Sequence, residues 1–455
     1  MSTCSLGWWG IVRLGLVQTA LGAVIVLTTS TINRIMVVEL GLAAMVPGFL
    51  VALHHVVQMS RPRFGYGSDI GGRRTPWILG GMFVLATGGF GAAVGTAMLA
   101  NAVSGGMLVA MISFVLIGLG SGAAGTSLLV LLADQVEAKR KAAAATIVWI
   151  MMIAGFAITA GVAGSFLDPY SPGRLVAVSG VVSIVALTIS VLALLGVENR
   201  ERRVRPATAL DSGVTEGAAS FRTALRQVWQ ESQARRFTIF VFVSMLAYSA
   251  QDLILEPYAG TVFDMTPGES TSLSGLQHSG VLLGMLVLAV TVTMTSRGGA
   301  TVLRRWTVGG CLASAAALAG IALGGHLSSE WPLRANVFLL GLANGVFAVS
   351  AIASMMTLAN HGSAQREGLR MGLWGASQAI AFALGGFLGT VAIDLARAMF
   401  SDPAQAYALV FGAEAALFVV AAGIGAYAQG EEIDTARRDA PRFGDVAVAQ
   451  VLGGR

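Results

Sequence analysis

Apolar stretches of roughly 20 residues recur along nearly the whole chain, separated by short polar breaks. A stretch of about 20 apolar residues is long enough to cross a bilayer as a helix. Only 12% of the residues are charged, about half the share in soluble domains, so a large water-facing surface is excluded. The 58 glycines suit this class, because glycine lets membrane helices approach closely. The sequence therefore predicts an all-α polytopic membrane protein.

Twelve spans account for the apolar runs. We expect them near residues 11–32, 43–60, 76–98, 107–133, 142–166, 174–197, 237–256, 272–295, 302–324, 333–359, 369–393 and 406–428. With the N-terminus in the cytoplasm, 25 of the 29 Lys and Arg residues fall on the cytoplasmic side, as the positive-inside rule requires. Both termini are therefore expected to be cytoplasmic. The net charge of +5 reflects loops beside anionic lipid and gives no reason to invoke nucleic acid.

A long polar segment divides the chain into two similar parts. The expected units are an N-terminal six-helix half (1–197), a cytoplasmic linker (198–236), a C-terminal six-helix half (237–428) and a cytoplasmic tail (429–455). Trp149 and Trp374 lie 225 positions apart in similar contexts, and Asp168 and Asp394 close the two matching segments. A duplicated six-helix unit places a binding cavity near the membrane midplane, between the halves.

The segment GYGSDIGGRR (65–74) between the second and third spans resembles the loop signature of the major facilitator superfamily, with Ile70 in place of a basic residue. Its matching positions are Gly65, Asp69, Gly72, Arg73 and Arg74. Glycines allow a tight turn, and a carboxylate can accept bonds from arginine or from a helix N-terminus. The resemblance implies a twelve-helix major facilitator fold with two pseudo-symmetric halves. It also implies a latch between them, with a merely positive loop as the alternative.

Charged and polar residues gather at the ends of the first and seventh spans. They are Asn33, Arg34 and Glu39 in one half, and Gln251, Asp252 and Glu256 in the other. Asp252 and Glu256 are four residues apart, hence on one helix face, and Pro257 is expected to end or kink that helix. We expect an ion pair between Arg34 and Asp252 or Glu256 that joins the two halves. The alternative is a set of charges solvated separately by lipid headgroups.

Ionisable residues inside membrane spans are rare and commonly functional. His54, His55 and Gln58 occupy the second span, and Gln277 and His278 the eighth. For His54 we favour a packing role. His55 and His278, with Gln58 and Gln277 beside them, are candidates to bind pigment or substrate, because a neutral imidazole can ligate a metal, including the magnesium of a chlorophyll, or carry a proton. Glu414 is either a buried relay carboxyl or lipid-facing. We expect no metal site belonging to the protein itself.

Several motifs resemble a narrower group. They are RLGLVQ (13–18), NRIMVVEL (33–40), RPRFGYGSD (61–69), RRTPW (73–77) and QDLILEPY (251–258). Together they resemble the PucC family, the BCH/PucC branch of the major facilitator superfamily, whose members include PucC, LhaA and a chain labelled as a bacteriochlorophyll synthase. The resemblance covers residues 11–428. The short N-terminus favours the last of these relatives.

The resemblance implies a bacteriochlorophyll-handling assembly factor that holds or delivers pigment to light-harvesting antenna polypeptides. The expected cargo is bacteriochlorophyll or a precursor, and the expected partners are membrane lipid, antenna polypeptides and pigment-synthesis enzymes. The expected location is the bacterial inner or intracytoplasmic photosynthetic membrane. A proton-coupled secondary transporter is the alternative. An enzyme that attaches the pigment tail is disfavoured, because the chain has no Asp-x-x-x-Asp motif for magnesium diphosphate.

Overall fold

The computed structural model describes residues 6–61, 64, 73–137, 140–198, 226, 229–294, 299–327, 331–360 and 367–428, and every regular element in these ranges is helical. The first half comprises α1 (Trp8–Val26), η1 (Leu27–Thr31), α2 (Ile32–Arg34), η2 (Ile35–Glu39), α3 (Met45–Val57), η3 (Gln58–Ser60), α5 (Thr75–Ala100), α6 (Gly106–Gln135), α7 (Lys141–Leu167) and α8 (Pro172–Leu194). The second half comprises α10 (Ser232–Val262), α11 (Pro267–Met294), α12 (Gly299–Leu327), α13 (Leu333–Asn360), α14 (Glu367–Met399) and α15 (Pro403–Ala428).

These helices agree with the twelve predicted spans. Within the described ranges, eleven helices are long and apolar enough to cross a membrane, and Met45–Ser60 forms a shorter apolar twelfth. The first span is longer than predicted, because α1, η1, α2 and η2 run on without a break to Glu39. Of the two effects predicted for Pro257, an end or a kink of the seventh span, the first is wrong, since α10 continues to Val262. Proline removes one amide donor, which a tightly packed membrane bundle tolerates.

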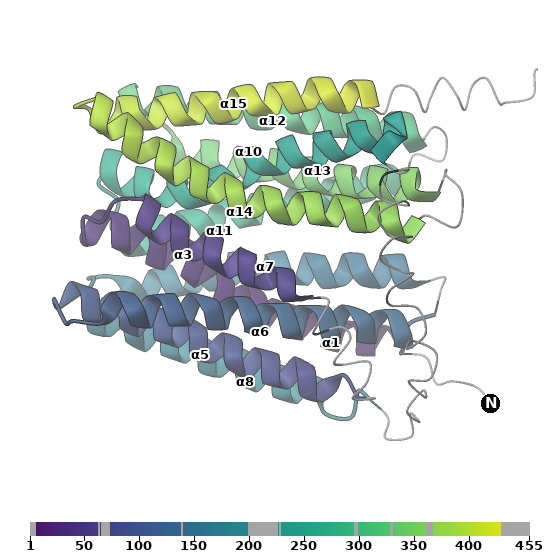
Figure 1. Ribbon diagram of the computed structural model, residues 1–455, viewed down its shortest axis with the longest axis horizontal. Coiled ribbons are helices and arrows are strands. Elements are labelled where there is room, and N and C mark those ends of the chain that lie inside the picture. Colours follow the sequence, from purple (N-terminus) through teal and green to yellow (C-terminus); the bar gives the residue numbers. More distant parts are fainter. Residues whose placement is uncertain are drawn as a thin grey trace, which may run out of the picture.

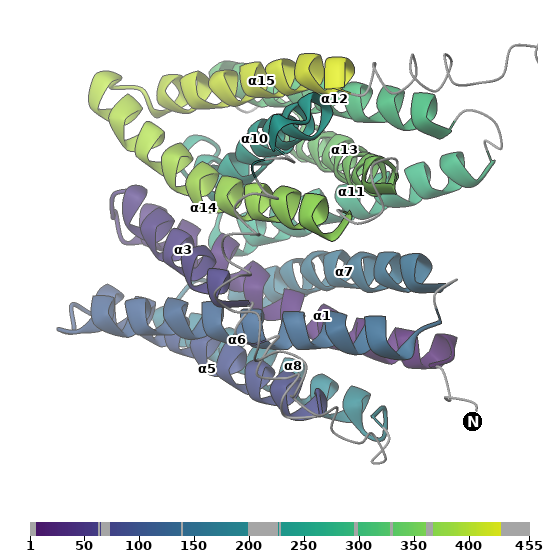
Figure 2. The same cartoon turned by 45° about the vertical axis from the view of Figure 1, so that its right-hand side comes forward.

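The helices form two bundles that lie side by side, the first in purple and blue and the second in green and yellow (Figures 1 and 2). Each bundle surrounds its own apolar core. Residues such as Leu14, Phe114 and Leu128 fill the first core, and Phe240, Phe347 and Phe411 fill the second. The bundles meet along two seams, at which α7 packs against α11 and α3 packs against α14.

The two ends of the molecule differ in the connections they carry. We call the end with the connections at 40–44, 101–105, 168–171, 263–266 and 400–402 the turn end. The opposite end, at which α1 and α10 begin and α15 finishes, is the linker end. In Figure 1 the turn end is on the left and the linker end on the right.

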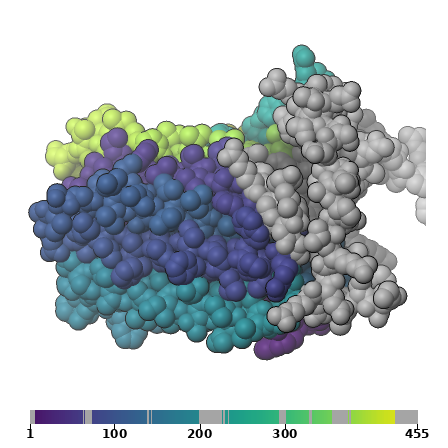
Figure 3. All heavy atoms as spheres, turned by 60° about the horizontal axis from the view of Figure 1, so that its bottom comes forward, coloured from purple at the N-terminus to yellow at the C-terminus, as the bar shows by residue number. Residues whose placement is uncertain are grey.

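The outward faces of the helices are apolar. Figure 3 shows this surface from the side of the first half, with the blue helices α5 and α6 facing the viewer. Large apolar side chains there are well exposed, for example Phe83 at 59% and Leu108 at 62%. On α8, Ile184 is 68% exposed. A soluble protein seldom exposes so continuous an apolar surface, whereas hydrocarbon solvates it. The chain is therefore a multi-pass membrane protein.

Candidate functional site

The first helix widens at two places where it meets the second half. η1 and η2 are π-helical turns on either side of α2. A π turn makes i→i+5 hydrogen bonds instead of i→i+4, and such turns occur frequently at functional sites. The polar residues at positions 28, 30, 31, 33 and 34 of this region are buried, whereas Thr29 is half-buried and Glu39 is exposed. The first span therefore presents a polar strip inside the bundle, close to the turn end.

Ser30 contacts two helices of the second half. Its hydroxyl donates to the Glu256 carboxylate on α10 and also lies 3.0 Å from the Ser274 hydroxyl on α11. Glu256 is only 2% exposed, and its second oxygen, Oε2, has no hydrogen-bond partner among the described residues. A buried carboxyl oxygen without a partner is costly and calls for a physical reason. This site can therefore accept a further donor.

Two neighbours of Ser30 extend the contact between the halves. The hydroxyls of Thr31 and Thr271 lie 3.0 Å apart, and Asn33 donates from Nδ2 to the Leu253 carbonyl at 2.6 Å. The Asn33 amide oxygen has no partner in the described part of the chain. Asn33 thus joins the two halves through a bond to backbone and not to a charged group.

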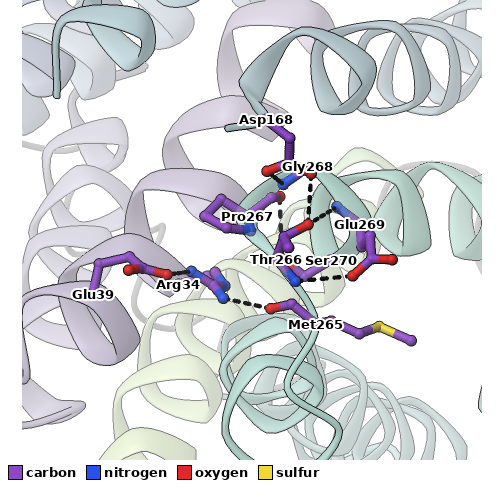
Figure 4. Close-up of polar contacts among 9 residues, drawn as sticks. All are labelled: Arg34, Glu39, Asp168, Met265, Thr266, Pro267, Gly268, Glu269 and Ser270. Carbon is purple, nitrogen blue, oxygen red and sulfur yellow. Dashed lines mark hydrogen bonds and ion pairs between the residues drawn. The ribbon is translucent and has the colours of Figure 1, made fainter. Parts of the chain in front are cut away.

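Arg34 is 2% exposed and carries the only ion pair of the charge cluster among the described residues (Figure 4). Its Nη1 pairs with Glu39, and its Nη2 donates to the Met265 carbonyl of the second half at 2.6 Å. The predicted ion pair with Asp252 or Glu256 is therefore wrong. The reason is local: the π turn of η2 brings Glu39, five residues further on, to the face that Arg34 occupies.

A cavity of about 570 Å³ opens beside this ion pair at the turn end. Arg34, Glu39, Asp168, Tyr170 and Asp264 lie in its wall. The Tyr170 hydroxyl and the Arg34 Nε atom are buried without partners in the described ranges. Burial, together with the nearby Glu39 carboxylate, raises the pKa of Tyr170.

The remaining charged candidates lie away from Arg34. Asp252 is partly exposed. Glu414 on α15 is 3% exposed, and neither oxygen of its carboxyl group is bonded to a described residue. Gln251 is fully buried, and both polar atoms of its amide likewise lack partners there. Glu414 is therefore a buried carboxyl, and the lipid-facing alternative is wrong.

The histidines of α3 have different surroundings. His54 is buried, and its Nε2 lies 2.5 Å from the Gln58 amide nitrogen, in agreement with a packing role. The Gln58 oxygen accepts a bond from Arg61. His55 is half-buried at the seam, and its ring centroid lies 6.0 Å from that of Phe382 on α14. Gln58 is thus already engaged, whereas His55 faces the second half.

His278 lies at the other seam. Its Nδ1 is 2.8 Å from the Ser274 carbonyl, and its ring meets that of Phe156 on α7 edge to face, with centroids 5.1 Å apart. Gln277 is buried beside it. Because His55 belongs to the α3–α14 seam and His278 to the α7–α11 seam, the four candidates do not form one pocket.

The loop signature lies largely outside the described residues, which include Arg73 and Arg74 but not Gly65, Asp69 or Gly72. Arg74 Nη2 is 3.7 Å from the Asp134 carboxylate, and the amides of Arg74 and Thr75 donate to Glu198. Burial of the Glu198 carboxyl opposes ionisation, but these amide bonds and the charge of Arg73 lower its pKa overall. The latch itself stays a prediction.

The aspartates that close the two repeated segments also join the halves. Asp394 accepts hydrogen bonds from two backbone amides of the first half, and Asp168 accepts one from a backbone amide and one from a hydroxyl of the second half. Their spacing of 226 positions, which matches the internal repeat, is the signal in the sequence that points to them. The hydroxyls of Ser30, Thr31, Thr271 and Ser274 are not predicted by the sequence, because isolated Ser and Thr residues are common in membrane helices.

The chain resembles known proteins over most of its length. The family model of the PUCC protein matches residues 31–426. The chain belongs to the PucC family. This PucC-family protein is 51% identical over 419 residues to the bacteriochlorophyll synthase 44.5 kDa chain of Rhodobacter capsulatus, covering 92% of this chain and 95% of that one. It is 29% identical to Protein PucC of the same organism, over 90% of each chain.

Solved structures of transporters resemble this PucC-family protein. A crystal structure of a D-xylose–proton symporter matches with a TM-score of 0.69 and 12% identity, covering 91% of this chain and 96% of the other. A crystal structure of the peptide transporter POT in complex with sulfate matches with a TM-score of 0.66 and 18% identity, covering 96% and 97%. At such low identity the likeness shows the fold alone. It confirms the predicted major facilitator fold.

Proposed function

We propose that the protein is a bacteriochlorophyll-handling assembly factor that holds or delivers pigment, or a precursor, to antenna polypeptides of light-harvesting complexes. The observation that carries the proposal is the 51% identity to a relative named for bacteriochlorophyll synthesis, together with membership of the PucC family. The protein would act in the photosynthetic membrane, beside newly inserted antenna chains and pigment-synthesis enzymes.

His278 is the best candidate for a pigment ligand. The Ser274 carbonyl can only accept a hydrogen bond, so Nδ1 of His278 carries the proton and Nε2 keeps its lone pair in the neutral ring. Histidines that ligate a metal commonly donate their other ring nitrogen to a carbonyl, which fixes the orientation of the ring. Bacteriochlorophyll would supply a magnesium ion, which the free Nε2 of His278 could ligate. No such orienting bond is present at His55 within the described residues.

The protein is proposed to be a carrier of pigment and not an enzyme. A prenyltransferase needs paired acidic motifs to bind magnesium diphosphate, and the sequence has none. Asp252 and Glu256 come nearest in spacing, but Glu256 is already bonded to Ser30 inside the bundle. Turnover of a pigment precursor with a prenyl diphosphate by the purified protein would overturn this part of the proposal.

The test is the absorption spectrum of the protein purified in mild detergent from pigment-producing cells. We expect co-purified bacteriochlorophyll or precursor, and at least a roughly threefold lower ratio of pigment to protein in His278→Ala, the change produced by about 0.7 kcal/mol. His326→Ala is the matched control, because His326 is an exposed histidine on α12. Wild-type protein without any pigment would contradict the proposal, and an equal loss in both variants would remove His278 as the ligand.

A proton-coupled secondary transporter is the second candidate. The unpartnered carboxyl oxygens of Glu256 and Glu414 in the described bundle favour it, because buried carboxyls in membrane bundles often serve as proton relays. Proton uptake by proteoliposomes, recorded with a pH-sensitive dye while candidate solutes are added, distinguishes the two. Solute-dependent uptake that is lost in Glu256→Gln would favour the transporter.

A further inference from the structure

Asp168, at the C-terminal end of α7, binds the start of α11 in the other half. Its Oδ1 accepts the Gly268 amide at 3.1 Å, and its Oδ2 accepts the Thr266 hydroxyl at 2.5 Å (Figure 4). Thr266 and Glu269 also bond reciprocally, as a capping box at the N-terminus of α11. A Cβ atom on Gly268 would overlap the Asp168 carboxylate, so only glycine allows this approach.

Asp394, near the end of α14, makes the equivalent contact in the opposite direction. Its Oδ1 accepts the Ala44 amide at 2.9 Å, and its Oδ2 accepts the Met45 amide at 2.7 Å. These two amides belong to the start of α3 in the first half. Free amides at a helix N-terminus carry partial positive charge, and a carboxylate there is stabilising. Each half therefore contributes one carboxylate and one helix N-terminus.

The two contacts are related by the internal repeat. Asp394 follows Asp168 by 226 positions, and the helix pairs α7–α11 and α14–α3 exchange roles between the halves. If Asp168 only capped its own helix, no equivalent contact from Asp394 to the first half would be expected. The repetition indicates that the pair acts as a unit across both seams.

The hydrogen bonds that join described residues of the two halves lie toward the turn end. Besides the two aspartates, they involve residues 30 to 34 with residues 253 to 274. Further along the α7–α11 seam, the contact is apolar, with Ile153 packed near Val281 and Met285. Among the described residues, the hydrogen bonds between the halves are therefore concentrated at the turn end.

The chemistry of these two contacts suits repeated opening. At each contact one of the two donors belongs to an exposed residue beside a connecting turn, Met45 or Thr266, whereas the other, Ala44 or Gly268, is buried. Water can therefore reach each carboxylate from the exposed side when the halves part. When the two aspartate contacts break, water can solvate the carboxylates and their donors. The contacts around Ser30 are buried, so the polar groups there are not solvated in this way. We propose that Asp168 and Asp394 form a matched pair of latches that hold the turn end closed and release together when the halves separate.

The test measures the distance between the halves by electron spin resonance in nanodiscs. After Cys4→Ser and Cys311→Ala, spin labels are placed at Val103 in the first half and Met399 in the second, which are 48% and 74% exposed at the turn end. Loss of one latch should raise the ratio of the longer to the shorter distance about tenfold, the change produced by roughly 1.4 kcal/mol. Asp168→Ala with Asp394→Ala should raise it further.

The control variant is Asp402→Ala. Asp402 also binds a helix N-terminus at the turn end, through the Ala404 amide at 2.9 Å, but within its own half. A distance distribution of the double variant equal to that of the wild type would refute the proposal, as would an equal change in the control. If the double variant does not fold, Asp168→Asn with Asp394→Asn keeps one acceptor oxygen at each site and should give an intermediate ratio. The measurement requires no pigment, so it stands apart from the proposed function.

Discussion

Arg34 stabilises the turn end through two interactions, the ion pair with Glu39 and the hydrogen bond to the Met265 carbonyl. Replacing Arg34 and Glu39 in separate variants distinguishes them. Arg34 is 2% exposed and Glu39 is 31% exposed, so their ion pair is partly screened by solvent. An exposed ion pair contributes about 0.2–1 kcal/mol, whereas a charged hydrogen bond such as that from Arg34 to the Met265 carbonyl contributes about 1.5–3 kcal/mol. Most of the effect should therefore come from the contact with the second half.

We expect Arg34→Ala to lower the free energy of unfolding by about 3 kcal/mol and Glu39→Gln by about 1 kcal/mol. The larger value combines the lost bond with the unpaired Met265 carbonyl. Arg34→Lys should lie between the two, because one ammonium cannot reach both acceptors. Titration with sodium dodecyl sulfate in mixed micelles, followed by near-ultraviolet circular dichroism, measures these differences.

An independent variant tests the same contact without removing charge. A Cβ atom on Gly260 would lie 2.9 Å from Arg34 Nη2, so Gly260→Ala should displace the guanidinium and destabilise the protein. Glu39→Gln as costly as Arg34→Ala would refute the reasoning, because the ion pair would then account for the whole effect. A neutral Gly260→Ala would refute it as well.

Three further predictions concern other parts of the molecule. Gly275→Ala should lower the melting temperature, because a Cβ atom there would lie 2.7 Å from the Gly161 amide nitrogen. The control is Gly161→Ala, which should leave the melting temperature unchanged, because no described atom lies within 4 Å of the new Cβ. Because the folded-state pKa of Glu198 is lowered, its ionised carboxylate should stabilise the protein at pH 7, and this contribution should be lost as the pH falls through that pKa. The melting temperatures of wild type and Glu198→Gln, measured between about pH 7 and pH 4, should therefore converge at the acidic end. A constant difference between them would contradict this. Glu414→Leu should keep or raise the melting temperature, because neither carboxyl oxygen is bonded within the described residues, and a marked loss would indicate a structural partner.

The positions of the candidate residues show where the sequence is a sufficient guide. The position of Asn33 and Arg34 at the end of the first span follows from two facts visible in the sequence, the apolar flanks and the internal repeat. Their burial between the halves, and not in the lipid headgroups, is decided by the structure. The partner of Arg34 does not follow, because it depends on a π turn that shifts the helix face by one residue. Local hydrogen-bond register of this kind is set by packing against α10 and α11.

The sequence alone determined that the chain forms twelve apolar helices in two repeated halves, since span length and repeat spacing are properties of the chain itself. It also placed His55 and His278 in membrane spans. Only the tertiary structure decided that these histidines lie at different seams, and that Asp168 and Asp394 bind helix N-termini of the opposite half. Contacts between residues so far apart in the chain depend on how whole helices pack, and a linear pattern carries no record of which helix faces meet.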